Sequence, residues 1–119
     1  MGHLSTHVLD TANGCPAAGM KVRLLRVHDD GRAELVRELT LNEDGRNDGG
    51  PLLDDRSMAK GRWRLVFGVA AYFRGRGTTL PEPAFIDEVP IDFGIADVDG
   101  HYHVPLLVSP FSYGTYRGS

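Results

Sequence analysis

Turn-forming residues punctuate this chain at short and regular intervals. Its 15 glycines and 7 prolines gather in segments such as NGCP, DDG, EDGRNDGG, GRGTTLPEP and DVDG, which recur at roughly ten-residue spacing. Short runs rich in β-branched and aromatic residues lie between these segments, and such residues favour strands. The pattern predicts an all-β sandwich or barrel.

Alternation within the runs indicates which side chains face the core. In RWRLVFGV the apolar residues fall on one face of the expected strand, while Arg62, Arg64 and Gly68 fall mostly on the other. Similar alternation occurs in MKVRLLRVH and in AFIDEVPIDFG, where Pro90 lacks a backbone N–H and predicts an edge strand or a bulge. The residues expected to face the core are Met20, Val22, Leu24, Trp63, Leu65, Phe67, Val69, Phe85, Val89, Ile91 and Phe93.

These patterns place the elements along the chain. We predict strands near 4–10, 20–28, 32–41, 62–69, 86–94, 102–109 and 112–118, with room for a further short strand near 52–54. The segment VAAYFRGRG predicts a short helix, which Gly75 and Gly77 would end. The chain closes on YGTYRGS, residues 113–119, and its aromatic residues predict an end that is docked on the protein.

Length and composition bound the function. A chain of 119 residues predicts one domain over 1–119, and its 41% hydrophobic and 24% charged residues are typical of a globular protein. A net charge of −3 and scattered arginines argue against a nucleic-acid partner. No apolar stretch is long enough to span a membrane and no secretory signal is recognisable, so we expect a cytoplasmic protein.

Motifs for nucleophilic catalysis are missing from the sequence. Cys15 is the only cysteine, so it has no disulfide partner within the chain, and we expect it in a turn next to Pro16. The chain contains neither a Gly-x-Ser-x-Gly elbow nor a glycine loop that would cradle a phosphate. Its chemistry is therefore expected to use histidine, arginine and water.

Histidine spacing offers a candidate site. His101 and His103 lie two residues apart, so on a strand both side chains project from the same face. Adding His7 would give three nitrogen ligands, a set that zinc can use in a hydrolase, but a His-x-His pair alone is a weak metal motif. The segment DVDG at 97–100 lacks the downstream glutamate of a calcium loop and is interpreted as a turn.

Arg46 follows an Asp-Gly pair that favours a tight turn. Its guanidinium could be a solvated surface group, or its fork of donors could hold a planar, oxygen-bearing substrate. The spacing alone leaves both interpretations open.

Three segments together, LSTHVLDTANGCPAAGMKVRL, EDGR and HYHVPLLVSPFSYGTYRGS, resemble the 5-hydroxyisourate hydrolases, which are transthyretin-like enzymes of urate breakdown. The resemblance runs through YFRGRGTTLPEPAFIDEVPIDFGIAD, and the terminal Tyr-Arg-Gly-Ser separates these enzymes from transthyretin, a hormone carrier of the same fold. It implies two four-stranded sheets with a short helix before the sixth strand. It also implies a homotetramer whose active sites lie in the channel at the dimer–dimer interface.

The same resemblance implies roles for individual residues. His7, Arg46, His103 and Ser119 match the catalytic set, and His7, Arg46, Tyr116, Arg117 and Gly118 match substrate-binding positions. It implies no metal or other cofactor, and it gives His101 no catalytic role.

The reaction implied is hydrolysis of 5-hydroxyisourate to 2-oxo-4-hydroxy-4-carboxy-5-ureidoimidazoline, in which water attacks a cyclic amide. A histidine would take the proton from water, and either His7 or His103 fits that role. Arg46 would stabilise the negative charge that develops on the carbonyl oxygen. Two alternatives stay open: a transthyretin-type carrier that binds an aromatic ligand in the intersubunit channel, and a zinc hydrolase built on His7, His101 and His103.

Overall fold

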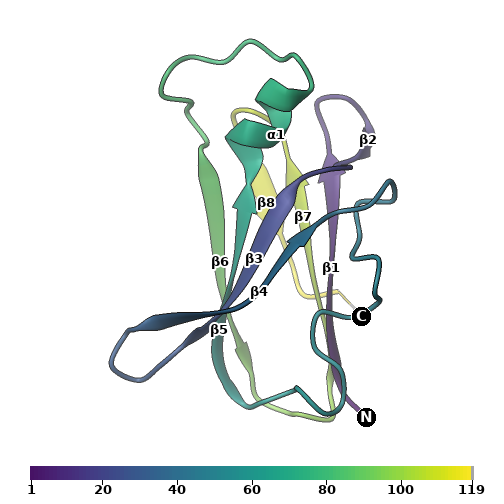
Figure 1. The fold of residues 1–119 in the computed structure, drawn as a ribbon, viewed down its shortest axis with the longest axis vertical. Coiled ribbons are helices and arrows are strands. Elements are labelled where there is room, and N and C mark those ends of the chain that lie inside the picture. The colour runs from purple at the N-terminus through teal and green to yellow at the C-terminus, as the bar shows by residue number, and fades with distance from the viewer. Residues whose placement is uncertain (119) are drawn as a thin grey trace.

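Two four-stranded β-sheets face each other in the computed structural model, which describes residues 1–118 (Figure 1). The first sheet has the strand order β2-β1-β7-β8, and the second has the order β4-β3-β5-β6. The first sheet contains β1 (His3–Asp10), β2 (Cys15–Pro16), β7 (His101–Val108) and β8 (Tyr113–Thr115). The second contains β3 (Lys21–Val27), β4 (Ala33–Thr40), β5 (Gly61–Gly68) and β6 (Glu88–Ile95). The predicted sandwich of two four-stranded sheets is confirmed.

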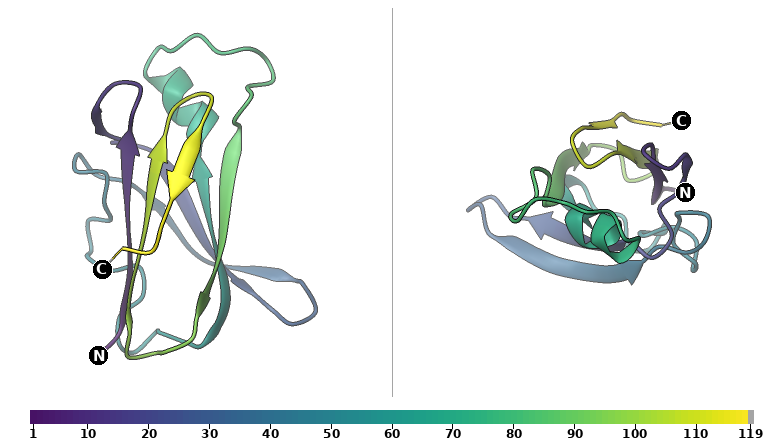
Figure 2. Two further views of the ribbon diagram at one scale, coloured as in Figure 1. Left: turned by 180° about the vertical axis from the view of Figure 1, so that it is seen from behind. Right: turned by 90° about the horizontal axis from the view of Figure 1, so that it is seen from above.

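One short helix, α1 (Val69–Gly75), follows β5 directly and precedes β6, as predicted. Seen from above, the purple and yellow strands of the first sheet lie on one side of the molecule and the blue strands β3 and β4 of the second sheet on the other, and the side view shows α1 at one end of the sandwich (Figure 2). The side chain of Phe73 on α1 is fully buried in the core. No helix within residues 1–118 combines the length and the apolar character that crossing a membrane requires.

The hydrophobic core lies between the sheets and is built by the alternation seen in the sequence. Burial of a large apolar side chain contributes about 1.5–3 kcal/mol, so this interior holds the two sheets together. The predicted core residues that are buried are Met20, Val22, Leu24, Trp63, Leu65, Phe67, Val69 and Val89. Ile91 and Phe93 are partly buried and pack against this core. Pro90 lies on β6, which is an edge strand, as its missing N–H predicted.

Phe85 contradicts its predicted place in the core, because 74% of its surface is exposed. The strand begins only at Glu88, so Phe85 lies in the preceding loop, where a period of two does not apply. Its ring lies 6.2 Å from that of Phe111, between centroids, in the turn between β7 and β8.

Three smaller differences concern short elements. Cys15 was expected in a turn, but it begins the two-residue strand β2, which pairs with the end of β1. The segment near 52–54 contributes only an isolated bridge between Leu53 and Leu4. The last predicted strand is shorter than 112–118, since β8 ends at Thr115 and the chain then returns to β7 through a bridge at Gly118. Two-residue contacts of this kind leave too little periodicity to be recognised in a sequence.

β1 and β7 lie side by side and run parallel, although they come from opposite ends of the chain. Their register pairs His3 with His101, Ser5 with His103 and His7 with Pro105. Alternate residues of β1 point into the core, so the odd-numbered ones point outward. The outer face of this strand pair therefore gathers polar side chains that the sequence separates widely.

A buried carboxylate joins α1 to β1. Asp10 has no exposed surface, and it accepts hydrogen bonds from the Tyr72 hydroxyl at 2.8 Å and from the backbone and side chain of Asn13. Burial alone would raise the pKa of Asp10, but these hydrogen bonds outweigh it and hold the pKa below its ordinary value. Arg76 completes the group, donating to the Tyr72 hydroxyl and to Cys15 Sγ.

Replacing Tyr72 with Phe is expected to destabilise the fold by about 1.5–3 kcal/mol, because a buried carboxylate loses a charge-assisted hydrogen bond. Urea unfolding followed by circular dichroism would measure the change. Tyr113→Phe, at a tyrosine that is 48% exposed, is the matched control and should leave the free energy of unfolding nearly unchanged. Equal effects of the two substitutions would contradict the proposed importance of the Asp10–Tyr72 bond.

Candidate functional site

The outer face of the β1–β7 pair carries four histidines. His3 and His7 come from β1, and His101 and His103 come from β7. The rings of His3 and His101 stack with centroids 4.2 Å apart. His7 and His103 are the two histidines that the sequence singled out for catalysis, and both are partly buried. The fold thus brings these two catalytic candidates onto one face.

His103 is held on several sides. The Oγ atom of Ser5, its register partner on β1, lies 2.8 Å from His103 Nδ1. The backbone N–H of Gly118 donates to the His103 carbonyl oxygen at 2.8 Å. A Cβ atom at Gly118 would lie only 2.6 Å from His103 Cδ2, so glycine lets the chain end pack directly against the ring. These contacts leave Nε2 as the ring nitrogen without a hydrogen-bond partner among the described residues.

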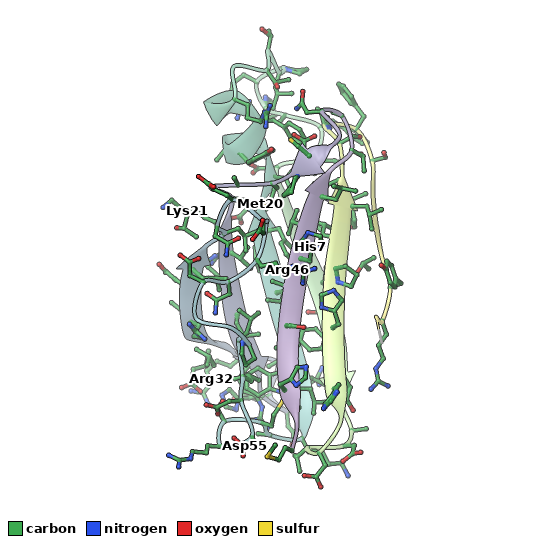
Figure 3. All side chains as sticks on the ribbon, turned by 90° about the vertical axis from the view of Figure 1, so that its right-hand side faces the viewer. His7, Met20, Lys21, Arg32, Arg46 and Asp55 are labelled. Carbon is green, nitrogen blue, oxygen red and sulfur yellow. The ribbon has the colours of Figure 1, made fainter. Side chains whose placement is uncertain are left out.

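Arg46 reaches this face from the loop between β4 and β5. Asn42 organises the turn, since its side-chain oxygen accepts hydrogen bonds from the backbone N–H groups of Asp44 and Arg46. Gly45 takes a φ of +72°, and its carbonyl oxygen accepts a hydrogen bond from the N–H of Val8 on β1. The loop is thereby fixed against β1, and Figure 3 shows Arg46 next to His7.

The charge of Arg46 acts on both candidate histidines. Burial lowers the pKa of His7 and of His103, and the positive charge of Arg46 lowers both further. For His7, the backbone and the negative charge of Asp44 oppose this lowering of the pKa in part. For His103, His7 and His3 add to it. Both shifts favour the uncharged ring, the form that a histidine needs if it is to accept a proton from water.

The chain end lies along β7, as expected from its composition. The hydroxyl of Thr115 donates to the Pro105 carbonyl oxygen at 2.7 Å. Arg117 turns toward the edge of the sheet, where its guanidinium lies 4.2 Å from the centre of the Tyr102 ring and donates to the His101 carbonyl oxygen. Tyr116 is 60% exposed. Ser119 lies outside the described residues, so its predicted catalytic role stays a prediction.

The histidines do not form a ready metal centre. Within residues 1–118 no group of three or more His, Cys, Asp or Glu side chains is placed to hold a metal ion, and the proposed zinc set of His7, His101 and His103 is not brought together. The DVDG segment forms a turn in which the Gly100 N–H donates to the Asp97 carbonyl oxygen.

Ser5 is the residue of this site that the sequence did not reveal. A serine beside THVLD carries no signal of its own in one sequence. Only the parallel register of β1 and β7 shows that its hydroxyl lies against His103.

This chain belongs to the HIUase/Transthyretin family, whose match covers residues 4–118. The 5-hydroxyisourate hydrolase 2 of Rhizobium meliloti is 55% identical over 118 residues, which cover 99% of this chain and 97% of that protein. The 5-hydroxyisourate hydrolase of Pseudomonas aeruginosa is 53% identical over 119 residues, covering 100% of this chain and 93% of that protein. The resemblance seen in the sequence is confirmed.

Solved structures give the same picture of the fold. (S)-allantoin synthase superposes with a TM-score of 0.92 at 47% identity, and the match covers 99% of this chain but only 44% of that longer chain. The 5-hydroxyisourate hydrolase of Klebsiella pneumoniae matches over 100% of both chains, with a TM-score of 0.76 and 34% identity. Sea bream transthyretin in complex with thyroxine matches 97% of this chain and 93% of its own, with a TM-score of 0.83 and 26% identity.

Titration of the histidines tests the electrostatic account. We expect His7 and His103 to titrate below the ordinary value of 6.5, and Arg46→Ala to raise both pKa values because a neighbouring positive charge is removed. Ring C–H signals in NMR spectra, followed from pH 4 to 8, would report each midpoint. Arg23→Ala, at an exposed arginine paired with Glu88 on the second sheet, is the control.

Folding lowers the pKa of both histidines, so at acidic pH the unfolded chain binds more protons than the folded one. The two histidines therefore add to the free energy of unfolding above pH 6.5. This contribution is lost as the pH falls through their pKa values in the folded protein. Midpoints that stay the same in Arg46→Ala would contradict the role assigned to its charge.

Gly118→Ala is expected to lower the rate of 5-hydroxyisourate hydrolysis by at least about tenfold while the protein stays folded. The reason is that the new Cβ must displace either the chain end or the His103 ring. Steady-state kinetics with 5-hydroxyisourate would measure the rate, and circular dichroism would check the fold. Gly75→Ala is the matched control, since a Cβ there meets no described atom within 4 Å. Full activity in Gly118→Ala would show that the close packing against His103 is dispensable.

Proposed function

We propose that this chain is a 5-hydroxyisourate hydrolase that opens the six-membered ring of its substrate to give 2-oxo-4-hydroxy-4-carboxy-5-ureidoimidazoline. The observation that carries the proposal is the meeting of His7, Arg46 and His103, from three separate segments, at one face of the first sheet. Relatives named 5-hydroxyisourate hydrolase match this chain over nearly its whole length, which supports the same conclusion.

The chemistry needs an activated water molecule and a site for the developing oxyanion. An uncharged imidazole accepts the proton from water, and a general base in position typically contributes about a hundredfold to ten-thousandfold in rate. Arg46 stabilises the negative charge on the carbonyl oxygen, and a preorganised donor of this kind contributes about 3–4 kcal/mol. Tyr116, Arg117, Gly118 and Ser119 are proposed to line the pocket, with Ser119 in a catalytic role. No step in this scheme requires a metal.

The assembly is proposed to be a homotetramer with active sites at the dimer–dimer interface. Support comes from the family, and from a candidate site that is open on the outer face of a sheet. Tyr116, which lies 60% exposed in one chain, would then help to form a pocket wall beside a neighbouring subunit. The cytoplasmic location and the single domain over residues 1–119 stay predictions.

A carrier function is the alternative, because sea bream transthyretin in complex with thyroxine shares the fold. The polar face argues against it. An apolar ligand gains nothing from an arginine and two partly buried histidines, one of which is fixed by Ser5 and Gly118. The names of the relatives at 55% and 53% identity also favour the hydrolase.

An enzyme assay tests the proposal directly. Urate oxidase would generate 5-hydroxyisourate from urate in the cuvette, and the loss of its ultraviolet absorbance would be compared with spontaneous decay. The native protein is expected to accelerate the loss, while His103→Asn and Arg46→Ala should each lower turnover by a hundredfold or more, a typical loss for a base or an oxyanion donor.

His28→Asn provides the matched control, since His28 lies after β3 on the second sheet and contacts Glu34. It should keep full activity. No acceleration by the native protein would overturn the hydrolase proposal and favour the carrier, whereas equal rates in all variants would exclude the assigned residues.

A further inference from the structure

The two histidines of the candidate site have different neighbours across the β1–β7 pair. His103 lies opposite Ser5 and contacts its hydroxyl group, whereas His7 lies opposite Pro105, which has no side-chain donor. A neutral imidazole has one nitrogen that donates and one that accepts, and the partner of one nitrogen determines the state of the other. The surroundings therefore assign different chemical roles to the two rings.

The Ser5 hydroxyl lies 2.8 Å from His103 Nδ1. Among the described residues, Nδ1 is the only hydrogen-bond partner of the Ser5 side chain. A bare imidazole nitrogen is a stronger acceptor than a hydroxyl oxygen, so the arrangement favours a hydrogen bond from the hydroxyl to Nδ1. The ring proton of neutral His103 then lies on Nε2, the nitrogen that Ser5 and Gly118 leave free.

His7 lacks such a neighbour. It lies opposite Pro105 on β7, whose side chain carries no hydrogen-bond donor. A neutral imidazole keeps one bare nitrogen, so His7 can offer that nitrogen to a water molecule. His7 also lies next to Arg46, which the turn organised by Asn42 places there.

We propose that Ser5 is a positioning residue that holds His103 as a hydrogen-bond donor through Nε2–H, which leaves His7 as the general base of the reaction. The inference rests on the proposed hydrolase function and assigns the two histidines, which the sequence alone left interchangeable. Ser5 itself touches no reacting atom.

The reaction balances with these roles. The bare nitrogen of His7 takes one proton from water while the water oxygen bonds to the carbonyl carbon of the ring amide. His103 Nε2–H and Arg46 donate hydrogen bonds to the oxygen that becomes negative, without transferring a proton. The C–N bond of the amide then breaks, and the protonated His7 returns its proton to the leaving nitrogen.

Nitrogen-15 NMR of the histidine rings tests the assignment without substrate. Long-range correlations between ring nitrogens and ring C–H protons distinguish the two neutral forms, and the spectra would be taken well above pH 6.5. In the native protein we expect the proton on Nε2 of His103. Ser5→Ala should give a mixture of both forms for His103, and Ser5→Thr, which keeps the hydroxyl on a β-branched side chain suited to a strand, should restore the Nε2–H form.

Kinetics of the same variants test the consequence for catalysis. Ser5→Ala is expected to lower kcat about tenfold with little change in KM, because part of the enzyme then presents the wrong nitrogen to an already bound substrate. Ser5→Thr should regain most of the lost kcat. Thr79→Ala removes an exposed hydroxyl in the loop after α1 and serves as the control for loss of a hydroxyl group.

The NMR and kinetic results distinguish a failure of the role proposed for Ser5 from a failure of the proposed hydrolase function. A native His103 protonated on Nδ1, or a Ser5→Ala protein with unchanged tautomer and kcat, would overturn the role of Ser5 even if the enzyme is active. Absence of hydrolase activity in the native protein would overturn the proposed function, while the NMR result would still decide whether Ser5 controls the His103 ring.

Discussion

The parallel pairing of β1 with β7 is the contact on which the rest of the site depends. It joins residues 98 positions apart in the sequence, such as Ser5 and His103, and its register places them opposite each other. Successive side chains of a strand point to opposite faces, so one set lies in the core and the other on the outer face of the sheet. Burial of Leu4 and Val8 on the inner side therefore fixes which residues of β1 are available for chemistry on the outer side.

Turns and backbone contacts complete what the two strands begin. The turn organised by Asn42 brings Arg46 and the Asp44 backbone to β1, and it needs a glycine at position 45, where a Cβ would lie 2.6 Å from the Val8 carbonyl oxygen. The chain end approaches from the other side, and glycine at 118 allows the same closeness to His103. Because neither glycine has a Cβ, the backbone at Gly45 can pack closely against β1 and the backbone at Gly118 against β7.

Much of the fold could be predicted because local patterns agree with the final structure. The alternation in the segment that became β5 identified Trp63, Leu65 and Phe67 as core residues, and Pro90 identified an edge strand. The prediction was wrong for Phe85, since nothing local shows that the strand starts three residues later. β2 was missed because a two-residue strand is defined by its partner and leaves no period of its own.

By itself, the sequence determined the sandwich, the family and the identity of His7, Arg46 and His103 as candidates, because periodicity and motifs are local properties of the chain. Only the tertiary structure decided that Ser5 faces His103 and that Pro105 lies opposite His7. Contacts between segments so distant in sequence depend on the register of the strands and on where the loops lie against them. A single amino-acid sequence does not specify either. The proposed roles of the two histidines depend on these contacts, so they could be inferred only from the folded protein.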